Sequence, residues 1–96
     1  MMEMGENTRL CVDASLTWQL LDGDAVLVSP QTGKIRVLNH VGAFIWQMVV
    51  NSCTTSDIQD ALVRSYNISP QQAQKDLAIF VDDLIQRKLV FWEQSS

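Results

Sequence analysis

The chain has 96 residues and is 47% apolar, which gives one domain with enough apolar side chains for a compact core and no room for a second domain of ordinary size. Its net charge of −4 argues against nucleic acid as a partner, because affinity for nucleic acid depends on lysines and arginines that contact phosphates. A protein or peptide partner fits this charge better.

The first residues carry no clear structural signal. Residues 1–14 lack the basic start and apolar centre of a secretory signal, and we expect them to form a flexible segment ahead of a folded domain over residues 15–92. No apolar run in the sequence approaches the ~20 residues that a membrane-spanning helix needs. The sequence therefore predicts a cytoplasmic protein that does not act in a membrane.

Three short runs of apolar and β-favouring residues predict strands over residues 16–21, 25–29 and 34–38. Asp22 and Gly23 separate the first two runs, and an Asp-Gly pair at this place favours a tight hairpin turn with positive φ. Pro30 and Gly33 frame the second turn, since proline fixes one φ and glycine frees another. The first half of the chain therefore predicts a three-stranded antiparallel meander.

The second half predicts three helices, over residues 39–51, 54–66 and 69–88. Asn39, Thr54 and Ser69 are the predicted N-caps, because their side-chain oxygens can accept from unpaired backbone N–H groups. Asp57 follows Thr54 in the first turn, and Pro70 follows Ser69 at the first helical position. Both arrangements are typical of helix starts.

The apolar residues of these helices follow a three-four spacing and predict the core. The expected core positions are Val41, Phe44, Ile45, Met48 and Val49 in the first helix, Ile58, Ala61, Leu62 and Tyr66 in the second, and Ala73, Leu77, Phe80 and Leu84 in the third. Residues 89–92, LVFW, are too few for another helix and predict a strand or an extended tail.

These elements define an α+β fold, a three-stranded antiparallel sheet followed by three helices. Only residues 66–69 separate the second helix from the third, as in a helix-turn-helix. We therefore interpret the arrangement as a winged helix-turn-helix.

The sequence shows no pattern of catalytic or metal-binding residues. Cys11 and Cys53 lie far apart in the chain and indicate two reduced thiols rather than a disulfide framework or a metal site. His40 has no serine or cysteine partner at a recognisable spacing. Asp82 and Asp83 are neighbours on a helix and point about 100° apart, so they do not converge on one ion. We expect no enzyme activity, no metal and no cofactor.

The third helix would be the recognition helix of a DNA-binding protein, and its charges argue against that role. Lys75, Arg87 and Lys88 are balanced by three aspartates in the same helix. The basic residues also gather at its C-terminal end, whereas recognition helices read bases from their N-terminal turns. A DNA-binding regulator remains the alternative to a peptide-binding protein.

The strand over residues 34–38 closes the meander and is expected to have free backbone groups on its outer side. A peptide can add to such an edge as a further strand. Lys34 and Arg36 allow two interpretations, because they either protect the edge from unwanted pairing or contact an acidic or polar peptide. One flank of the third helix borders its core stripe and would form the second wall of a groove. This flank consists of Asp76, Ile79, Phe80, Asp83 and Arg87.

The residues from Val37 to Trp46 read VLNHVGAFIW and resemble the LNxxGxxIW centre of PqqD-like proteins. The resemblance covers about residues 15–91. It continues at Thr54, Asp57, Ile58, Leu62, Tyr66, Ala73, Asp76, Leu77, Phe80, Val81, Leu84, Leu89 and Val90. The chain departs from the family's pattern at Lys88, where a glycine usually precedes the C-terminal apolar tail.

This resemblance implies a RiPP recognition element, which binds the leader of a ribosomally made and later modified peptide. In such elements the leader adds as a strand to the third strand and packs against the third helix. The residues implied here are Leu27, Lys34, Ile35, Arg36, Val37, Leu38, Asp76, Ile79, Phe80 and Asp83. Leu27 and Val37 are expected to help form the floor of an apolar pocket.

A free-standing domain with this pattern resembles the discrete leader-binding subunit of lasso peptide systems. The resemblance then implies two partners, the precursor's leader and a leader peptidase of the transglutaminase-like cysteine protease type. The alternative is the pyrroloquinoline quinone pathway, where the partner is a radical SAM enzyme.

Overall fold

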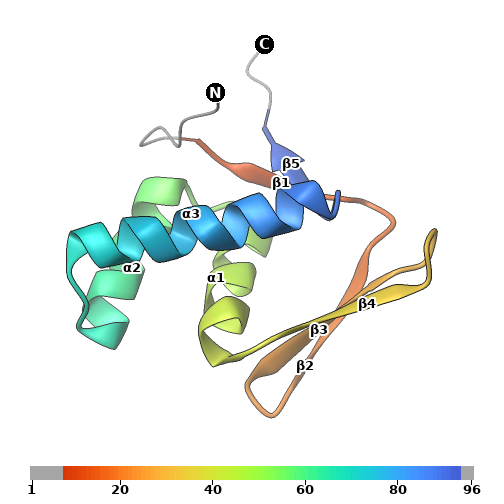
Figure 1. Ribbon diagram of the computed structural model, residues 1–96, viewed down its shortest axis with the longest axis horizontal. Coiled ribbons are helices and arrows are strands. Elements are labelled where there is room, and N and C mark those ends of the chain that lie inside the picture. Colours follow the sequence, from red (N-terminus) through yellow and green to blue (C-terminus); the bar gives the residue numbers. More distant parts are fainter. Residues whose placement is uncertain (1–7, 94–96) are drawn as a thin grey trace.

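The computed structural model describes residues 8–93, and Figure 1 shows their arrangement. The elements in chain order are β1 (Leu10–Val12), β2 (Thr17–Leu21), β3 (Asp24–Ser29), β4 (Lys34–Leu38), α1 (His40–Val50), α2 (Thr55–Tyr66), α3 (Pro70–Gln86) and β5 (Val90–Trp92). The predicted α+β order, three antiparallel strands and then three helices, is confirmed.

Strands β2, β3 and β4 form an antiparallel sheet in that order. The turn between β2 and β3 is the predicted Asp22-Gly23 pair, with φ of 53° and 87°, which matches the right-handed twist of the two strands. The turn between β3 and β4 ends at Gly33, whose φ is 72° and whose N–H donates to the carbonyl of Ser29 at 2.8 Å. All three predicted strands agree with the structure to within one residue.

One face of this sheet is buried against α1. Ala25 and Leu27 of β3 are fully buried, and the register places Leu38 of β4 opposite Ala25. Trp18 of β2 lies opposite Leu27 and meets Trp46 of α1 edge to face, with ring centroids 6.0 Å apart. This inner face therefore joins the sheet to the helices and fixes the orientation of β4.

Each helix starts at its predicted cap. The side chain of Asn39 accepts from the N–H of Gly42, and Thr54 and Asp57 form a reciprocal capping box. The side chain of Ser69 accepts from the N–H of Gln72. These caps accept from backbone N–H groups of the first helical turn, which have no carbonyl partner within the helix.

The core differs from the predicted stripes at several positions. Trp46 is fully buried and Val81 nearly so, and neither was among the expected core residues. Tyr66, which was expected in the core, is 38% exposed and packs its ring edge-on against Phe44. Phe80 is only partly buried, and this leaves part of its ring available to another molecule.

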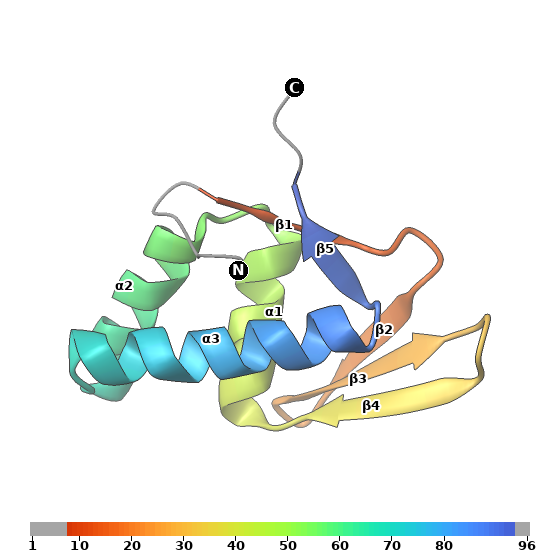
Figure 2. The ribbon, with the colours of Figure 1, turned by 45° about the horizontal axis from the view of Figure 1, so that its top comes forward.

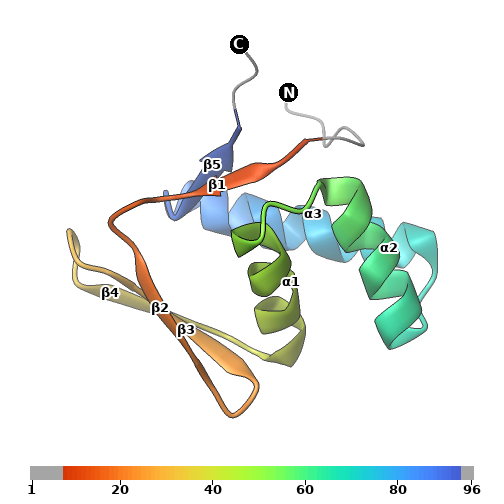
Figure 3. The ribbon, with the colours of Figure 1, turned by 180° about the vertical axis from the view of Figure 1, so that it is seen from behind.

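Strand β1 lies in the segment for which we expected no element, and it pairs antiparallel with β5 (Figure 3). Leu10 belongs to the core, and the N–H of Asp13 donates to the carbonyl of Leu89. Residues 89–92, predicted as a strand or tail, thus supply β5 for this second, two-stranded sheet. Residues 1–7 of the expected flexible segment lie outside the described residues.

The connection from α3 to β5 turns sharply at Lys88, whose φ is 60°. Backbone in this left-handed region suits glycine, because a Cβ atom there approaches the neighbouring carbonyl. This is the position at which the PqqD-like pattern usually has glycine.

Candidate functional site

The pairing within the sheet decides which backbone groups of β4 are free. In a two-residue hairpin the residues that flank the turn, here Leu21 and Asp24, exchange their backbone hydrogen bonds. Successive residues of a strand point their backbone groups to opposite sides, so every second residue of β3, starting with Ala25, bonds toward β4. The register pairs Ala25 with Leu38, and β4 therefore bonds to β3 through residues 38, 36 and 34.

The backbone N–H and C=O of Ile35 and Val37 consequently point away from β3, toward the outer edge. The contact of the Arg36 guanidinium with the carbonyl of Val37, at 3.5 Å, agrees with this orientation. Among residues 8–93 no strand pairs with that edge. The structure thus has the free edge that the sequence predicted.

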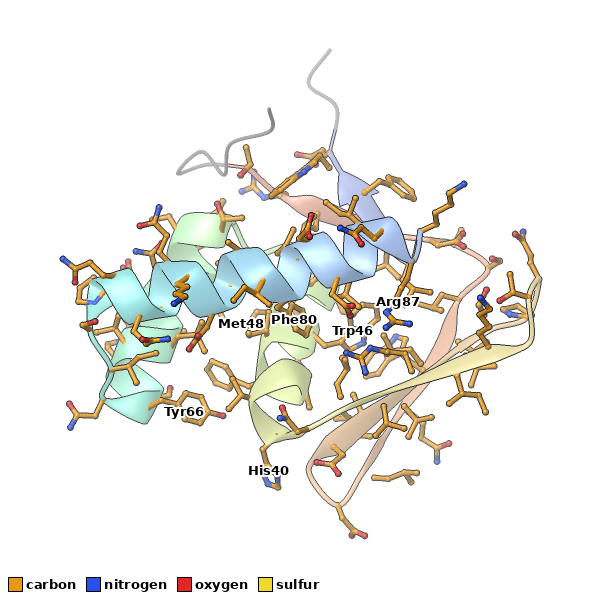
Figure 4. The ribbon with its side chains drawn as sticks, viewed as in Figure 1. His40, Trp46, Met48, Tyr66, Phe80 and Arg87 are labelled. Atoms are coloured by element: carbon orange, nitrogen blue, oxygen red, sulfur yellow. The ribbon has the colours of Figure 1, made fainter. Side chains whose placement is uncertain are left out.

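Figure 2 shows the ribbons of β4 and α3. A groove of about 490 Å³ is lined by residues of both elements, and we call it the apolar groove. Its lining includes Arg36, Val37, Leu38, Asp76, Ile79, Phe80 and Asp83, all of which were predicted as site residues. Ile79 projects from α3 with 61% of its surface exposed. Phe80 lies beneath α3 on the side facing α1 (Figure 4). The two side chains give the groove its apolar wall.

Four lining residues were not among the predicted site residues: Asn39, Val41, Gly42 and Ile45. They come from the N-cap and first two turns of α1, which close one end of the groove. Their signal in the sequence was the LNxxGxxIW motif, which contains Asn39, Gly42 and Ile45. The motif was used as evidence of family and not as a guide to the site.

Gly42 makes room at the bottom of the groove. A Cβ atom at this position would lie 3.1 Å from the Cβ of Leu38 and 3.3 Å from Cε1 of Phe80. Both distances are tighter than ordinary van der Waals contact, so a side chain here would push Phe80 or the end of β4 outward. Glycine therefore lets α1, α3 and β4 approach one another closely.

An ion pair crosses the groove and joins its two walls. The guanidinium of Arg36 on β4 meets Asp83 on α3, with Nη2 and Nε both 3.2 Å from Oδ2. Arg87, the C-cap residue of α3, donates from Nε to the same carboxylate at 3.1 Å. One carboxylate thus holds two arginines at the end of the apolar groove.

Beyond this ion pair lies a second cleft, of about 240 Å³, which we call the basic cleft. Its charged lining residues are Lys34 and Arg36 on β4 and Arg87 and Lys88 at the end of α3. Leu27, predicted to help form the floor of the apolar pocket, is a core residue that lines this second cleft instead. The apolar groove and the basic cleft follow the same strand edge, with Arg36 common to both.

Ile35 and Val37 were predicted as peptide-binding residues, and the register shows that they face away from α3. Side chains alternate along a strand, so both residues lie on the outer face of the sheet, opposite Val28 and Val26. They are 64% and 54% exposed. The expectation that the Val37 side chain helps form the pocket floor is therefore wrong; its backbone borders the groove.

Neither a metal site nor a membrane-spanning helix is found in the described part of the chain. No three His, Cys, Asp or Glu side chains among residues 8–93 gather as a metal site, and Cys11 and Cys53 are free thiols. His40 is largely exposed, and its nearest charged partner is Asp24 at 3.6 Å. Within the same residues, no helix combines the length and apolar character that crossing a membrane requires.

The family model described as coenzyme PQQ synthesis protein D matches residues 24–90. The structure of TbiB1 in complex with the TbiA(beta) leader peptide is similar to this chain, with 25% identity and a TM-score of 0.79, over 88% of this chain and 96% of that one. Lasso peptide synthetase B1 complexed with the leader peptide shares the fold at 20% identity, with a TM-score of 0.80, over 86% of this chain and 98% of that one. No curated protein sequence gives a significant match.

Proposed function

The chain belongs to the family of coenzyme PQQ synthesis protein D, and on this premise we propose that it binds the leader of a precursor peptide as a fourth strand beside β4. The observation that carries the proposal is the free edge at Ile35 and Val37 next to an apolar groove. Both similar structures contain a leader peptide, which supports the same role here. The chain would act as a RiPP recognition element in the cytoplasm, where precursor peptides are made.

The proposed peptide-binding residues fall into three groups. Ile35 and Val37 offer backbone groups, while Leu38, Ile79 and Phe80 offer apolar surface. Lys34, Arg36, Asp76 and Asp83 surround them with charge, and Leu27 lies beneath the basic cleft. This assignment keeps every residue predicted from the sequence and changes the part that Val37 and Leu27 play.

Backbone hydrogen bonds to β4 are too few to account for the affinity that leader binding requires. The outward-facing N–H and C=O groups of Ile35 and Val37 allow up to about four hydrogen bonds to a leader, each contributing roughly 1 kcal/mol. Micromolar affinity requires about 8 kcal/mol after the cost of ordering the peptide. One to three buried apolar side chains, at about 1.5–3 kcal/mol each, supply the difference. The apolar groove is therefore the main source of affinity and specificity.

We assign the chain to lasso peptide biosynthesis, because one similar structure is lasso peptide synthetase B1 with a leader peptide and the other is TbiB1 with the TbiA(beta) leader peptide. In this assignment the chain is not an enzyme, and it presents the leader to a separate leader peptidase of the transglutaminase-like cysteine protease type. The alternative is a chaperone for a radical SAM enzyme in pyrroloquinoline quinone synthesis, which the family name favours.

The outer face of the sheet supports the presence of a second protein partner. Ile35 and Val37 join Val26, Val28 and Leu21 in an apolar surface on the side away from α1. If a leader adds to β4 as a strand, every second leader side chain would lie on this outer face. An enzyme that covers the outer face would thus contact the carrier and its bound leader together.

The competing function is DNA binding by a winged helix-turn-helix. Helices α2 and α3 pack together with a short connection, which is the feature that suggests it. Three acidic residues on α3 and the net charge of −4 disfavour contact with phosphates. The hairpin sheet also precedes the helices, and the only strand after α3 in the described residues is β5, which pairs with β1.

The two functions are separated by fluorescence anisotropy with two probes. One is the labelled leader of the precursor peptide encoded in the same gene cluster, and the other is a labelled DNA duplex, each titrated over a range of salt concentrations. The proposal expects leader binding that weakens with salt far less steeply than duplex binding does. Absence of leader binding together with tight, strongly salt-dependent binding of the duplex would overturn it.

A further inference from the structure

The positive charge of this chain is concentrated at one end of the strand edge. Lys34, Arg36, Arg87 and Lys88 are four of the seven lysines and arginines in the chain, and they line one cleft. The chain as a whole carries eleven carboxylates, which make it acidic. The charge of this cleft is therefore opposite in sign to the net charge of the chain, and the cleft attracts anions.

Two of these four cations form an ion pair with a carboxylate, and the other two do not. Arg36 and Arg87 share the carboxylate of Asp83. Lys34 and Lys88 are exposed and form no ion pair with any residue of the described part of the chain. The cleft thus presents two unpaired ammonium groups, one from each wall.

The ordinary role of cations at a helix end explains only part of this cluster. Arg87 and Lys88 follow the last turn of α3, where positive charge offsets the negative end of the helix dipole. Lys34 belongs to β4 and is remote in sequence from that helix end. Its position on the same cleft as Lys88 brings two separate elements to one anion-binding place.

The direction of the added strand says which part of the leader passes this cleft. The sheet is antiparallel throughout, and antiparallel pairing is the more stable kind per residue. An antiparallel leader runs from the Leu38 end of β4 to the Lys34 end. Its N-terminal part would lie in the apolar groove, and its C-terminal part would enter the basic cleft.

We infer that the basic cleft selects a leader with an aspartate or glutamate on the C-terminal side of its apolar anchor. The inference rests on the proposed leader binding and adds a charge requirement to it. Residues 38 and 34 of β4 are four positions apart, about 13 Å in a strand. We therefore expect the acidic residue about four positions after the anchor. The number of positions between the two must be even, because an odd number would turn the acidic side chain to the outer face of the sheet.

The test starts from random linear peptides displayed as a library and selected on the intact chain. A selected peptide is taken forward when the variant Ile79→Asp binds it weakly, which shows that it occupies the apolar groove. It is then synthesised in three forms: as selected, with its acidic residue changed to the amide, and with that residue moved by one position. Binding is measured at low and at high salt.

The inference expects the amide form and the moved form to bind about fivefold more weakly at low salt, with a smaller difference at high salt. The double variant Lys34→Glu/Lys88→Glu should abolish this preference and favour a lysine at the same peptide position. Lys75→Glu, which reverses an exposed charge on α3 outside the cleft, is the matched control and should keep the preference.

The outcomes separate this inference from the function on which it rests. Peptides that bind the groove but show no preference for an acidic residue, or a preference that survives in the double variant, overturn the charge requirement and leave leader binding intact. A library that yields no peptide sensitive to Ile79→Asp overturns the proposed function and the inference with it.

Discussion

Arg36 and Asp83 lie 47 residues apart in the sequence and join β4 to α3 through two contacts of 3.2 Å between the guanidinium and one carboxylate oxygen. The pair separates the apolar groove from the basic cleft and holds the two walls at a fixed spacing. Because Asp83 also binds Arg87, one side chain positions both arginines.

Replacing Asp83 by asparagine should affect binding more than stability. More than a third of each side chain in the pair is exposed, so Asp83→Asn should lower the free energy of unfolding by about 1 kcal/mol or less. The freed arginines should change leader affinity severalfold. Urea unfolding and anisotropy measure the two effects. Asp82→Asn, which alters an exposed neighbour bonded only to Gln86 in the described residues, is the control. A stability loss above about 2 kcal/mol would show that the pair holds the fold itself.

Ile79 offers the cleanest test of the apolar groove. It is 61% exposed, so Ile79→Asp should leave the melting temperature nearly unchanged. Loss of one buried apolar contact should weaken leader binding about tenfold or more. Ala78→Asp places the same charge on an exposed neighbouring position outside the groove and should bind normally. Equal affinities for the two variants would show that the leader does not use this wall.

Phe80→Ala is a less specific variant, because Phe80 is also packed against the core. It should weaken leader binding and reduce stability together. Thermal melts are needed beside each binding curve, and only the folded fraction should be compared. Folded Phe80→Ala with unchanged affinity would contradict the placement of the site.

Gly42→Ala should narrow the groove from below. The new methyl group would press on Leu38 and on Phe80, at 3.1 and 3.3 Å. Alanine also favours the helix over glycine by about 1 kcal/mol, so we expect little net change in the free energy of unfolding. Leader affinity should fall severalfold as Phe80 shifts into the groove. Unaltered affinity in a folded variant would mean that the leader does not reach this depth.

Lys88→Gly should stabilise the chain and reduce its selectivity. The residue has a φ of 60°, which glycine adopts without strain, and the expected gain is about 0.5–1 kcal/mol. The same change removes a cation from the basic cleft and should weaken the preference for acidic peptides. Asn67→Gly is the control, since Asn67 has a φ of 53° and asparagine tolerates this conformation better than lysine. A larger gain at Asn67 than at Lys88 would contradict the explanation from strain.

The outer face should matter to the proposed partner enzyme more than to the leader. Ile35→Thr keeps a β-branched side chain and the backbone groups of the edge, so leader affinity should stay within about twofold. Cleavage of the leader by the proposed leader peptidase should slow when this variant delivers it. A strong loss of leader binding in Ile35→Thr would show that the Ile35 side chain is a main source of leader affinity.

Local signals predicted most of the fold. Asn39, Thr54 and Ser69 cap the helices as expected, because a cap depends only on the residues of one turn. The pairing of β1 with β5 could not be predicted in the same way. It joins the two ends of the described chain, and each strand has only three residues, too few for a periodic pattern.

Seven residues that line the apolar groove were among the predicted site residues, and their peptide-binding role stays a prediction. The strand edge and the flank of α3 were identified correctly as neighbours across the groove. The direction of the Val37 side chain was not, because it depends on which residues of β3 bond to β4. The Asp22-Gly23 turn contained this information, since a two-residue hairpin fixes the pattern of bonds in both neighbouring strands.

Amide hydrogen exchange of β4, followed by NMR with and without the leader, tests the central claim most directly. If the leader becomes a fourth strand, the N–H groups of Ile35 and Val37 should exchange much more slowly in the complex. The N–H of Arg36, already bonded to β3, should change little. Protection elsewhere on the protein, with Ile35 and Val37 exchanging as fast as before, would contradict it.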